Sequence, residues 1–259
     1  MSMERAELYE KYRMPYAQDA VPDLLRRIGD IDVVADIGAG TGQLARQFAP
    51  HCRIVYAVEP DASMRSVAQD ALAGLCARVV DGTAERTTLA SQSIDLIVAG
   101  NALHRFRYEA CAEFARVLRP EGWLAVFSYE SLDTAFQESL VAKLSSLPQL
   151  PAKSKRAFHR VSHASFFSGA ETLSVRYEQS CIREWDEFFG AACAGIESPE
   201  RSDVEFSQFE QVNRELFEEF AENGRITLRF ATSIVFGQSA RTATQQGLPA
   251  DGGDAAAEG

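Results

Sequence analysis

The feature that most constrains this chain is a glycine-rich turn between an apolar run and a helical pattern. Residues 33–37 (Val-Val-Ala-Asp-Ile) are a buried-strand pattern that carries a carboxylate at Asp36. Three glycines then follow at alternate positions: Gly38, Gly40 and Gly42. Strand, glycine turn and helix in this order bring the backbone close to a nucleotide-like ligand. The dinucleotide fingerprint G-x-G-x-x-G requires a third glycine where this chain has Gln43.

Residues 36–42 read D-x-G-x-G-x-G, which resembles the first motif of class I S-adenosylmethionine (SAM)-dependent methyltransferases. The resemblance implies an α/β fold: a seven-stranded, mostly parallel, Rossmann-like sheet with an antiparallel seventh strand and an inserted helical cap. It also implies SAM as the cofactor. SAM lacks a pyrophosphate, and a carboxylate near the turn suits its cationic amino-acid group. The residues expected to contact it here are Asp36, Gly38, Ala39, Gly40 and Gly42.

A second acidic residue, Glu59, lies near the end of the next apolar run, residues 53–60, and directly precedes Pro60. In α/β nucleotide folds an acidic residue at the end of the second strand accepts hydrogen bonds from ribose hydroxyls, and a carboxylate can take two such donors. Asp61 is the expected N-cap of a helix over residues 62–72. Met64 is expected on its ligand side.

A third segment, residues 78–85, is interpreted as a short strand and its loop. It resembles the G-[DT]-A-E segment that lines the adenine in this family. The cofactor contacts implied are Gly82, Thr83, Ala84 and Glu85. The leucine-proline-phenylalanine continuation usual in the family is replaced here by residues 86–89, Arg-Thr-Thr-Leu.

The fourth strand, expected over residues 93–100, leads into the segment favoured for chemistry. Asn101 is expected beside the cofactor. His104 matches the histidine of an A-x-x-H-[WHR]-F pattern common in small-molecule members of the family. Histidine suits proton removal near neutral pH, so His104 is the candidate base. The alternative is that its ring packs against the adenosine or bonds a backbone group.

The N-terminal residues are expected to be helical in two pieces, broken near Pro15 and Pro22. Residues 9–16 resemble the Y-x-x-x-R-P-x-Y entry segment of small-molecule methyltransferases, which folds over the cofactor as part of a lid. Acceptor contacts are therefore expected from Tyr12, Arg13 and Tyr16. The alternative is an amphipathic helix packed on the sheet edge.

The region before the last strand resembles the family only loosely. Residues 139–170 contain several basic residues and no acidic one, which indicates either an anion-recognising patch or a solvated face. Phe166 and Trp185 are candidates for lining an acceptor pocket, or else for a small cap core. Strands are expected over 173–181 and 226–236, with a helix over 202–222.

The expected organisation along the chain is an N-terminal lid (1–30), a SAM-binding core (31–130), a cap with the sixth strand (131–225), the final strand (226–237) and a disordered tail (238–259). A net charge of −11 argues against a nucleic-acid partner. No apolar run is long enough to span a membrane, and a cytoplasmic location is expected. The five cysteines show no metal-ligand spacing, so no metal is expected.

The function predicted is O- or N-methyl transfer from SAM to a small molecule, such as a carboxylate-bearing or natural-product acceptor. Two alternatives stay open. One is a catalytically silent SAM-binding or partner-binding protein, which would carry the same cofactor motifs. The other is a nicotinamide-dependent oxidoreductase, against which Gln43 counts. The oligomeric state is not predicted.

Overall fold

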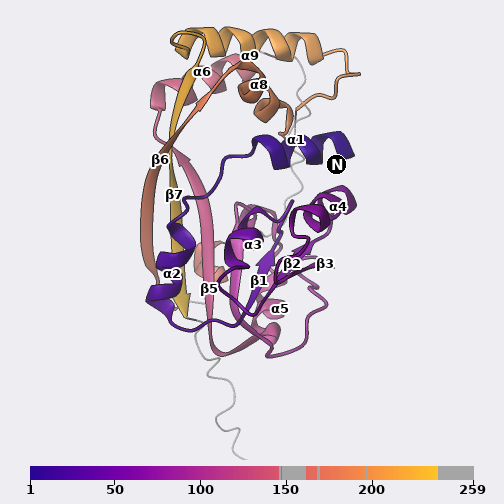
Figure 1. Cartoon of the computed structure of the whole chain (residues 1–259), viewed down its shortest axis with the longest axis vertical. Helices are drawn as coiled ribbons and strands as arrows, with labels where there is room; N and C mark the ends of the chain where they lie inside the picture. Colours follow the sequence, from indigo (N-terminus) through magenta and orange to yellow (C-terminus); the bar gives the residue numbers. More distant parts are fainter. Residues whose placement is uncertain (146, 148–161, 168–169, 196–197, 239–259) are drawn as a thin grey trace, which may run out of the picture.

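A seven-stranded sheet forms the centre of the computed structural model, which describes residues 1–145, 147, 162–167, 170–195 and 198–238. The strands lie in the order β3-β2-β1-β4-β5-β7-β6 (Figure 1). Neighbours among β1 to β5 are parallel, whereas β7 runs antiparallel to both β5 and β6. The predicted fold is confirmed. The strand bounds are β1 Val33–Ile37, β2 Ile54–Glu59, β3 Ala77–Asp81, β4 Ile94–Gly100, β5 Leu118–Ser131, β6 Leu173–Arg183 and β7 Ile226–Gln238.

Helices cover both faces of the sheet, because successive side chains of each strand point to opposite faces. In β1, Val33 and Ile37 belong to one buried cluster with Phe114, whereas Val34 belongs to another with Phe48. Every residue of β1 is buried, as expected for a central parallel strand. The helices are α1 Met3–Tyr12, α2 Ala20–Ile28, α3 Gln43–Phe48, α4 Ala62–Ala71, α5 Ala110–Val117, α6 Thr134–Ser145, α7 His163–Phe166, α8 Trp185–Cys193 and α9 Phe206–Phe220, with a 3₁₀ turn at Leu103–Arg105.

One local expectation needs correction. The break expected near Pro15 is present at residues 13–19, but there is none at Pro22, which lies inside the first turn of α2, where its missing N–H removes no helical hydrogen bond. The fifth strand begins at Leu118. The register of β4 against β5 shifts between Ile94 and Leu96, and Glu121 has a φ of 69°, so residues 119–122 form a bulge within β5.

The predicted cap region, residues 131–225, divides between two places. Helices α6, α8 and α9 gather at one end of the molecule, and α1 lies between them and the sheet domain (Figure 1). Phe136, Phe188 and Leu216 form the buried centre of that helical group. Helix α7 instead packs on the sheet, where Phe166 meets Phe114 with ring centroids 5.5 Å apart. The predicted tail, residues 238–259, lies outside the described residues except for Gln238, the last residue of β7.

Candidate functional site

The glycine turn has a backbone that other residues cannot easily adopt. Gly38, Gly40 and Gly42 have φ values of 71°, 58° and 84°, the left-handed region that favours glycine. A Cβ on Gly38 would stand 2.9 Å from the Cβ of Ala102. The amides of Gly38 and Ala39 both donate to the carbonyl of Val58 in the neighbouring strand. The turn is therefore fixed against β2 and against the end of β4.

Asp36 places a buried carboxylate beneath this turn. Its Oδ2 accepts a hydrogen bond from the Ala45 amide at 3.0 Å, whereas its buried Oδ1 accepts none from any residue that the structure describes. Burial raises the pKa of the Asp36 carboxyl to about 7, the Ala45 bond opposes that rise, and the nearby Glu59 adds to it. An ammonium group at Oδ1 would satisfy this oxygen, so the site suits the cationic amino-acid group of SAM.

Glu59 ends β2 beside the turn and is 8% exposed. Its Oε2 accepts from the Gly40 amide and its Oε1 from the Asp61 amide, each at 2.9 Å. Each oxygen has a second lone pair for a ribose hydroxyl. The next residue, Pro60, is exposed, and its carbonyl accepts from Arg65 at 2.6 Å. Glu59 thus joins the glycine turn to the start of α4.

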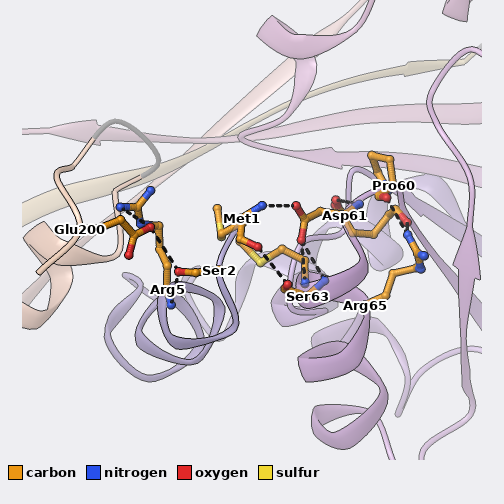
Figure 2. A network of polar contacts seen from close by, with 10 residues as sticks. Met1, Ser2, Arg5, Pro60, Asp61, Ser63, Arg65 and Glu200 are labelled. Atoms are coloured by element: carbon orange, nitrogen blue, oxygen red, sulfur yellow. Dashed lines mark hydrogen bonds and ion pairs between the residues drawn. The ribbon is translucent and has the colours of Figure 1, made fainter. Parts of the chain in front are cut away.

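The start of α4 follows the predicted pattern. The Asp61 carboxylate accepts from the amides of Ser63 and Met64, both at 3.0 Å, which makes it the N-cap. Met64 is buried. Figure 2 shows a polar network from this point to the chain's first residues: the ammonium of Met1 lies 2.7 Å from Asp61. The residues that precede α1 are thereby attached to the start of α4.

The same network continues from α1 to the loop before α9 (Figure 2). The guanidinium of Arg5 donates to the Ser198 carbonyl at 2.6 Å and lies 3.0 Å from the Glu200 carboxylate. Arg46 in α3 pairs with Glu10 of α1 at 2.6 Å. Ala6 is the one residue of α1 that is buried. Polar contacts on both sides therefore contribute much of the attachment of this helix.

The loop after β3 lies at the next strand end along the sheet. Gly82 has no room for a side chain, because a Cβ would stand 2.9 Å from the Thr87 carbonyl. Thr83 is exposed and forms an isolated bridge with Arg86, while Ala84 is buried. Glu85 accepts from the Arg107 amide at 2.8 Å. Glu85 therefore connects this loop to the one after β4, a role that the sequence reading did not assign.

At the end of β4, Asn101 has a φ of 50° and connects two elements. Its Nδ2 donates to the Tyr16 hydroxyl, and its Oδ1 accepts from the Tyr129 amide, each at 3.2 Å. His104 follows on the 3₁₀ turn with an exposed side chain. Both residues lie in the segment after the strand next to β1, at the point where the strand order reverses and α/β proteins bind ligands.

The segment expected to form the lid lies over this end of the sheet. The Tyr9 ring comes within 3.9 Å of the position a Cβ on Gly40 would take. Tyr16 is buried, stacks on Tyr129 at a centroid distance of 4.6 Å, and its hydroxyl would stand 2.6 Å from a Cβ on Gly100. Burial, first of all, raises the pKa of Tyr16 well above its usual value, so the phenol stays protonated near neutral pH.

Tyr129 was missed by the sequence reading, although it directly follows the apolar run of β5.

The remaining candidates for acceptor contact lie elsewhere. Tyr12 packs against Gly190 of α8, where a Cβ would stand 2.4 Å from its ring. Trp185 stacks on Phe189 with centroids 5.0 Å apart, within the helical group of the cap. Phe166 and Trp185 belong to different clusters, so the structure does not bring them together.

A separate open hollow of about 970 Å³ lies at the opposite, amino-terminal edge of the strands. Its charged lining consists of Asp30, Asp32 and Asp95 together with Arg26 and Arg119. Asp95 already pairs with Arg119 and accepts from the Val33 amide. This edge lies away from the glycine turn, so we assign it no part in the site.

Comparison with solved structures identifies the class of this fold. The described structure superposes on a candidate type II methyltransferase from Anaeromyxobacter dehalogenans with a TM-score of 0.58 at 20% identity, covering 88% of this chain and 98% of that one. The YcgJ protein of Bacillus subtilis gives 0.51 at 19% identity, with 92% and 98% covered. Both likenesses concern the fold, a Rossmann-like methyltransferase sheet.

The sequence comparisons concern the first half of the chain. Residues 35–126 match the methyltransferase domain family model. An uncharacterised methyltransferase of a Geobacillus species is 32% identical over 135 residues, which are 50% of this chain and 60% of the relative. The chain therefore spans little more than half the length of this relative. Residues 35–126 therefore resemble a methyltransferase domain, which confirms the resemblance to class I SAM-dependent methyltransferases seen in the sequence.

Two further findings concern the described residues only. Among them, no three histidine, cysteine, aspartate or glutamate side chains gather as ligands for a metal ion. None of their helices has the length and apolar character needed to cross a bilayer.

Proposed function

We propose that this chain transfers the methyl group of SAM to a small-molecule acceptor at the carboxyl ends of β1 and β4. The observation that carries the proposal is the Asp36 Oδ1, a buried carboxylate oxygen that accepts no hydrogen bond within the described part of the chain. It lies under a turn whose three glycines all have positive φ. A bound ammonium would compensate the cost of burying this oxygen.

In this proposal the chain's own residues bind and orient. Asp36 pairs with the ammonium, Glu59 accepts the ribose hydroxyls, and the loop of Gly82, Thr83 and Ala84 contacts the adenine. Bound SAM supplies a methyl carbon already activated by the adjacent sulfonium charge. The protein's remaining tasks are to align the acceptor and exclude water. Tyr9 and Tyr16, which cover the glycine turn and the end of β4, are placed for that exclusion.

His104 is proposed as the base for an acceptor whose heteroatom carries a proton. The acceptor's lone pair forms the new bond to carbon, the carbon–sulfur bond breaks toward sulfur, and the acceptor proton passes to the imidazole. General bases contribute roughly 10²–10⁴-fold. We therefore expect His104→Ala to lower turnover of a hydroxyl acceptor by about 100-fold and to leave S-adenosylhomocysteine (SAH) affinity within about twofold. Unchanged turnover would remove His104 from the mechanism.

The test of the proposed activity is acceptor-dependent formation of SAH. Purified protein is incubated with SAM and, in separate reactions, with small carboxylic acids, phenols and amines. SAH formation that requires one acceptor class, and is lost in Glu59→Ala, supports transfer. SAH binding without turnover across all three classes would instead favour the catalytically silent alternative.

A further inference from the structure

Arg13 is a cation with an unusual set of neighbours at the end of α1. Its guanidinium carbon lies 5.1 Å from the ring centroids of both Tyr9 and Tyr129, within the range of cation–π attraction. The residue is half-buried. None of the carboxylates in the described part of the chain forms an ion pair with it. Its charge thus lies against aromatic faces and, among the described residues, is paired with no acid.

The backbone on both sides of Arg13 is fixed by side chains from the other half of the molecule. Arg183 of β6 donates to the Tyr12 carbonyl at 2.6 Å. The hydroxyl of Tyr129 donates to the Met14 carbonyl, and Gln179 donates to the next carbonyl at 3.3 Å. These three hydrogen bonds fix the course of the backbone over residues 12–15. Arg13 therefore starts from a largely pre-organised position, which lowers the entropic cost of binding a ligand.

Arg13 lies between the glycine turn, where the cofactor is proposed to bind, and the end of β4, where the acceptor is proposed to bind. Of the two rings on Arg13, Tyr9 also lies beside Gly40 of the glycine turn. The other, Tyr129, stacks on Tyr16, whose hydroxyl contacts Asn101 after β4. A guanidinium binds a carboxylate through two parallel N–H groups, with a geometry that a lysine ammonium cannot reproduce.

We propose that Arg13 recognises a carboxylate of a molecule bound at the methyl-transfer site. The proposal rests on the proposed function, because it takes the glycine turn to be the SAM site. Two molecules could present this group: the cofactor, through its amino-acid carboxylate, or the acceptor. The chemistry recognised is the same in both, and the two sources predict different results in the experiment below.

The first arm measures calorimetric affinities of SAH and of 5′-methylthioadenosine, which keeps the adenosine and thioether but lacks the amino acid. If the cofactor supplies the carboxylate, Arg13→Gln weakens SAH about 10- to 100-fold, as charged hydrogen bonds typically do, and leaves 5′-methylthioadenosine unchanged. Arg13→Lys recovers only part of that loss. Arg78→Gln, which removes an exposed arginine from β3, is the matched charge control.

The second arm titrates SAH-saturated protein with 4-hydroxybenzoate and with 4-hydroxybenzamide as its uncharged counterpart. If the acceptor supplies the carboxylate, the wild type prefers the acid at least tenfold, Arg13→Gln loses that preference, and SAH affinity does not change. Circular dichroism and thermal unfolding check that each variant is folded.

The outcomes separate the two proposals. SAH binding by the wild type together with no effect of Arg13→Gln in either arm overturns the carboxylate assignment and makes Arg13 a structural contact of the tyrosines. Failure of the wild type to bind SAH overturns the proposed function as well. An equal loss of SAH and 5′-methylthioadenosine affinity also contradicts the assignment, because it would show a general distortion of the site.

Discussion

The proposed cofactor side and the proposed acceptor side of this site are built from different parts of the chain. On the cofactor side, backbone amides and the carboxylates of Asp36 and Glu59 lie within 24 consecutive residues, 36–59, and contact one another through two adjacent strands. On the proposed acceptor side, Tyr16 and Tyr129 come from segments about 115 residues apart, and Arg13 lies beside Tyr129. The first is defined by backbone conformation, the second by side chains that long-range packing brings together.

This difference teaches that the two sides respond to different perturbations. A site defined by backbone conformation depends on its glycines, because three of its residues have positive φ, a conformation that other residues rarely adopt. A site defined by side chains can lose or gain single contacts by substitution while the scaffold beneath it stays the same. The four predictions that follow test this separation, beginning with the largest free-energy change.

The first prediction concerns the cap. Leu216 is fully buried among Phe136, Phe188 and Phe217, so Leu216→Ala is expected to cost about 2–5 kcal/mol of unfolding free energy. SAH affinity should stay within about twofold, because the cap core and the glycine turn share no contact cluster. Urea unfolding and calorimetry measure the two effects.

Val141→Ala, at a 61% exposed position of α6, is the control and should change the free energy of unfolding little. A fall in SAH affinity parallel to the loss of stability in Leu216→Ala would show that the cap core and the glycine turn form one cooperative unit.

The second prediction concerns the glycine turn. Gly38→Ala combines a positive φ with a Cβ placed 2.9 Å from Ala102, and such strain costs about 1–3 kcal/mol. We expect SAH affinity to fall about 10- to 100-fold by calorimetry. Gly29→Ala is the matched control, because Gly29 has a φ of 87° but nothing within 4 Å of its Cβ position. Equal losses in the two variants would refute a specific role for the turn.

The third prediction concerns pH. The Asp36 carboxyl faces Glu59 and Tyr16 and has a pKa of about 7, so it is mostly protonated below pH 7. An ammonium ligand needs the ionised form, so SAH affinity should be about tenfold lower at pH 6 than its plateau above pH 8. Asp36→Asn should remove this slope.

The same raised pKa affects the ligand-free protein. Between about pH 4 and 7 the unfolded chain has lost the proton that folded Asp36 keeps, so this group lowers the free energy of unfolding as pH rises through that window. A pH-independent SAH affinity in the wild type would contradict the assignment of Asp36 to the ammonium.

The fourth and smallest prediction concerns the surface of α1. Glu4 pairs with Arg201 at 3.2 Å, and both side chains are mostly exposed. Exposed pairs contribute about 0–1 kcal/mol, so Glu4→Gln should lower the free energy of unfolding by no more than about 0.5 kcal/mol in thermal unfolding. A loss well above 1 kcal/mol would mean that this pair, and not the more buried contacts of Arg5, fixes the helix.

The same contrast explains what could be predicted from the sequence. The fold, the glycine turn and the Asp61 cap follow from patterns a few residues long, because strand, turn and helix signals are local. Tyr129 could not be assigned to the segment that it holds, since its partner Met14 lies 115 positions away. Arg183 and Tyr12 are 171 positions apart. Phe166 fitted an aromatic cap lining equally well, and only the packing of α7 on Phe114 decides its place.

The most direct test of the central claim, that the glycine turn and its two carboxylates form a SAM site, is a calorimetric titration of the purified protein with SAH. Glu59→Ala and a parallel titration with NADH are the comparisons. We predict micromolar SAH binding that is lost in Glu59→Ala, with weaker or no binding of NADH. Absence of SAH binding, or tighter binding of NADH, would contradict the account.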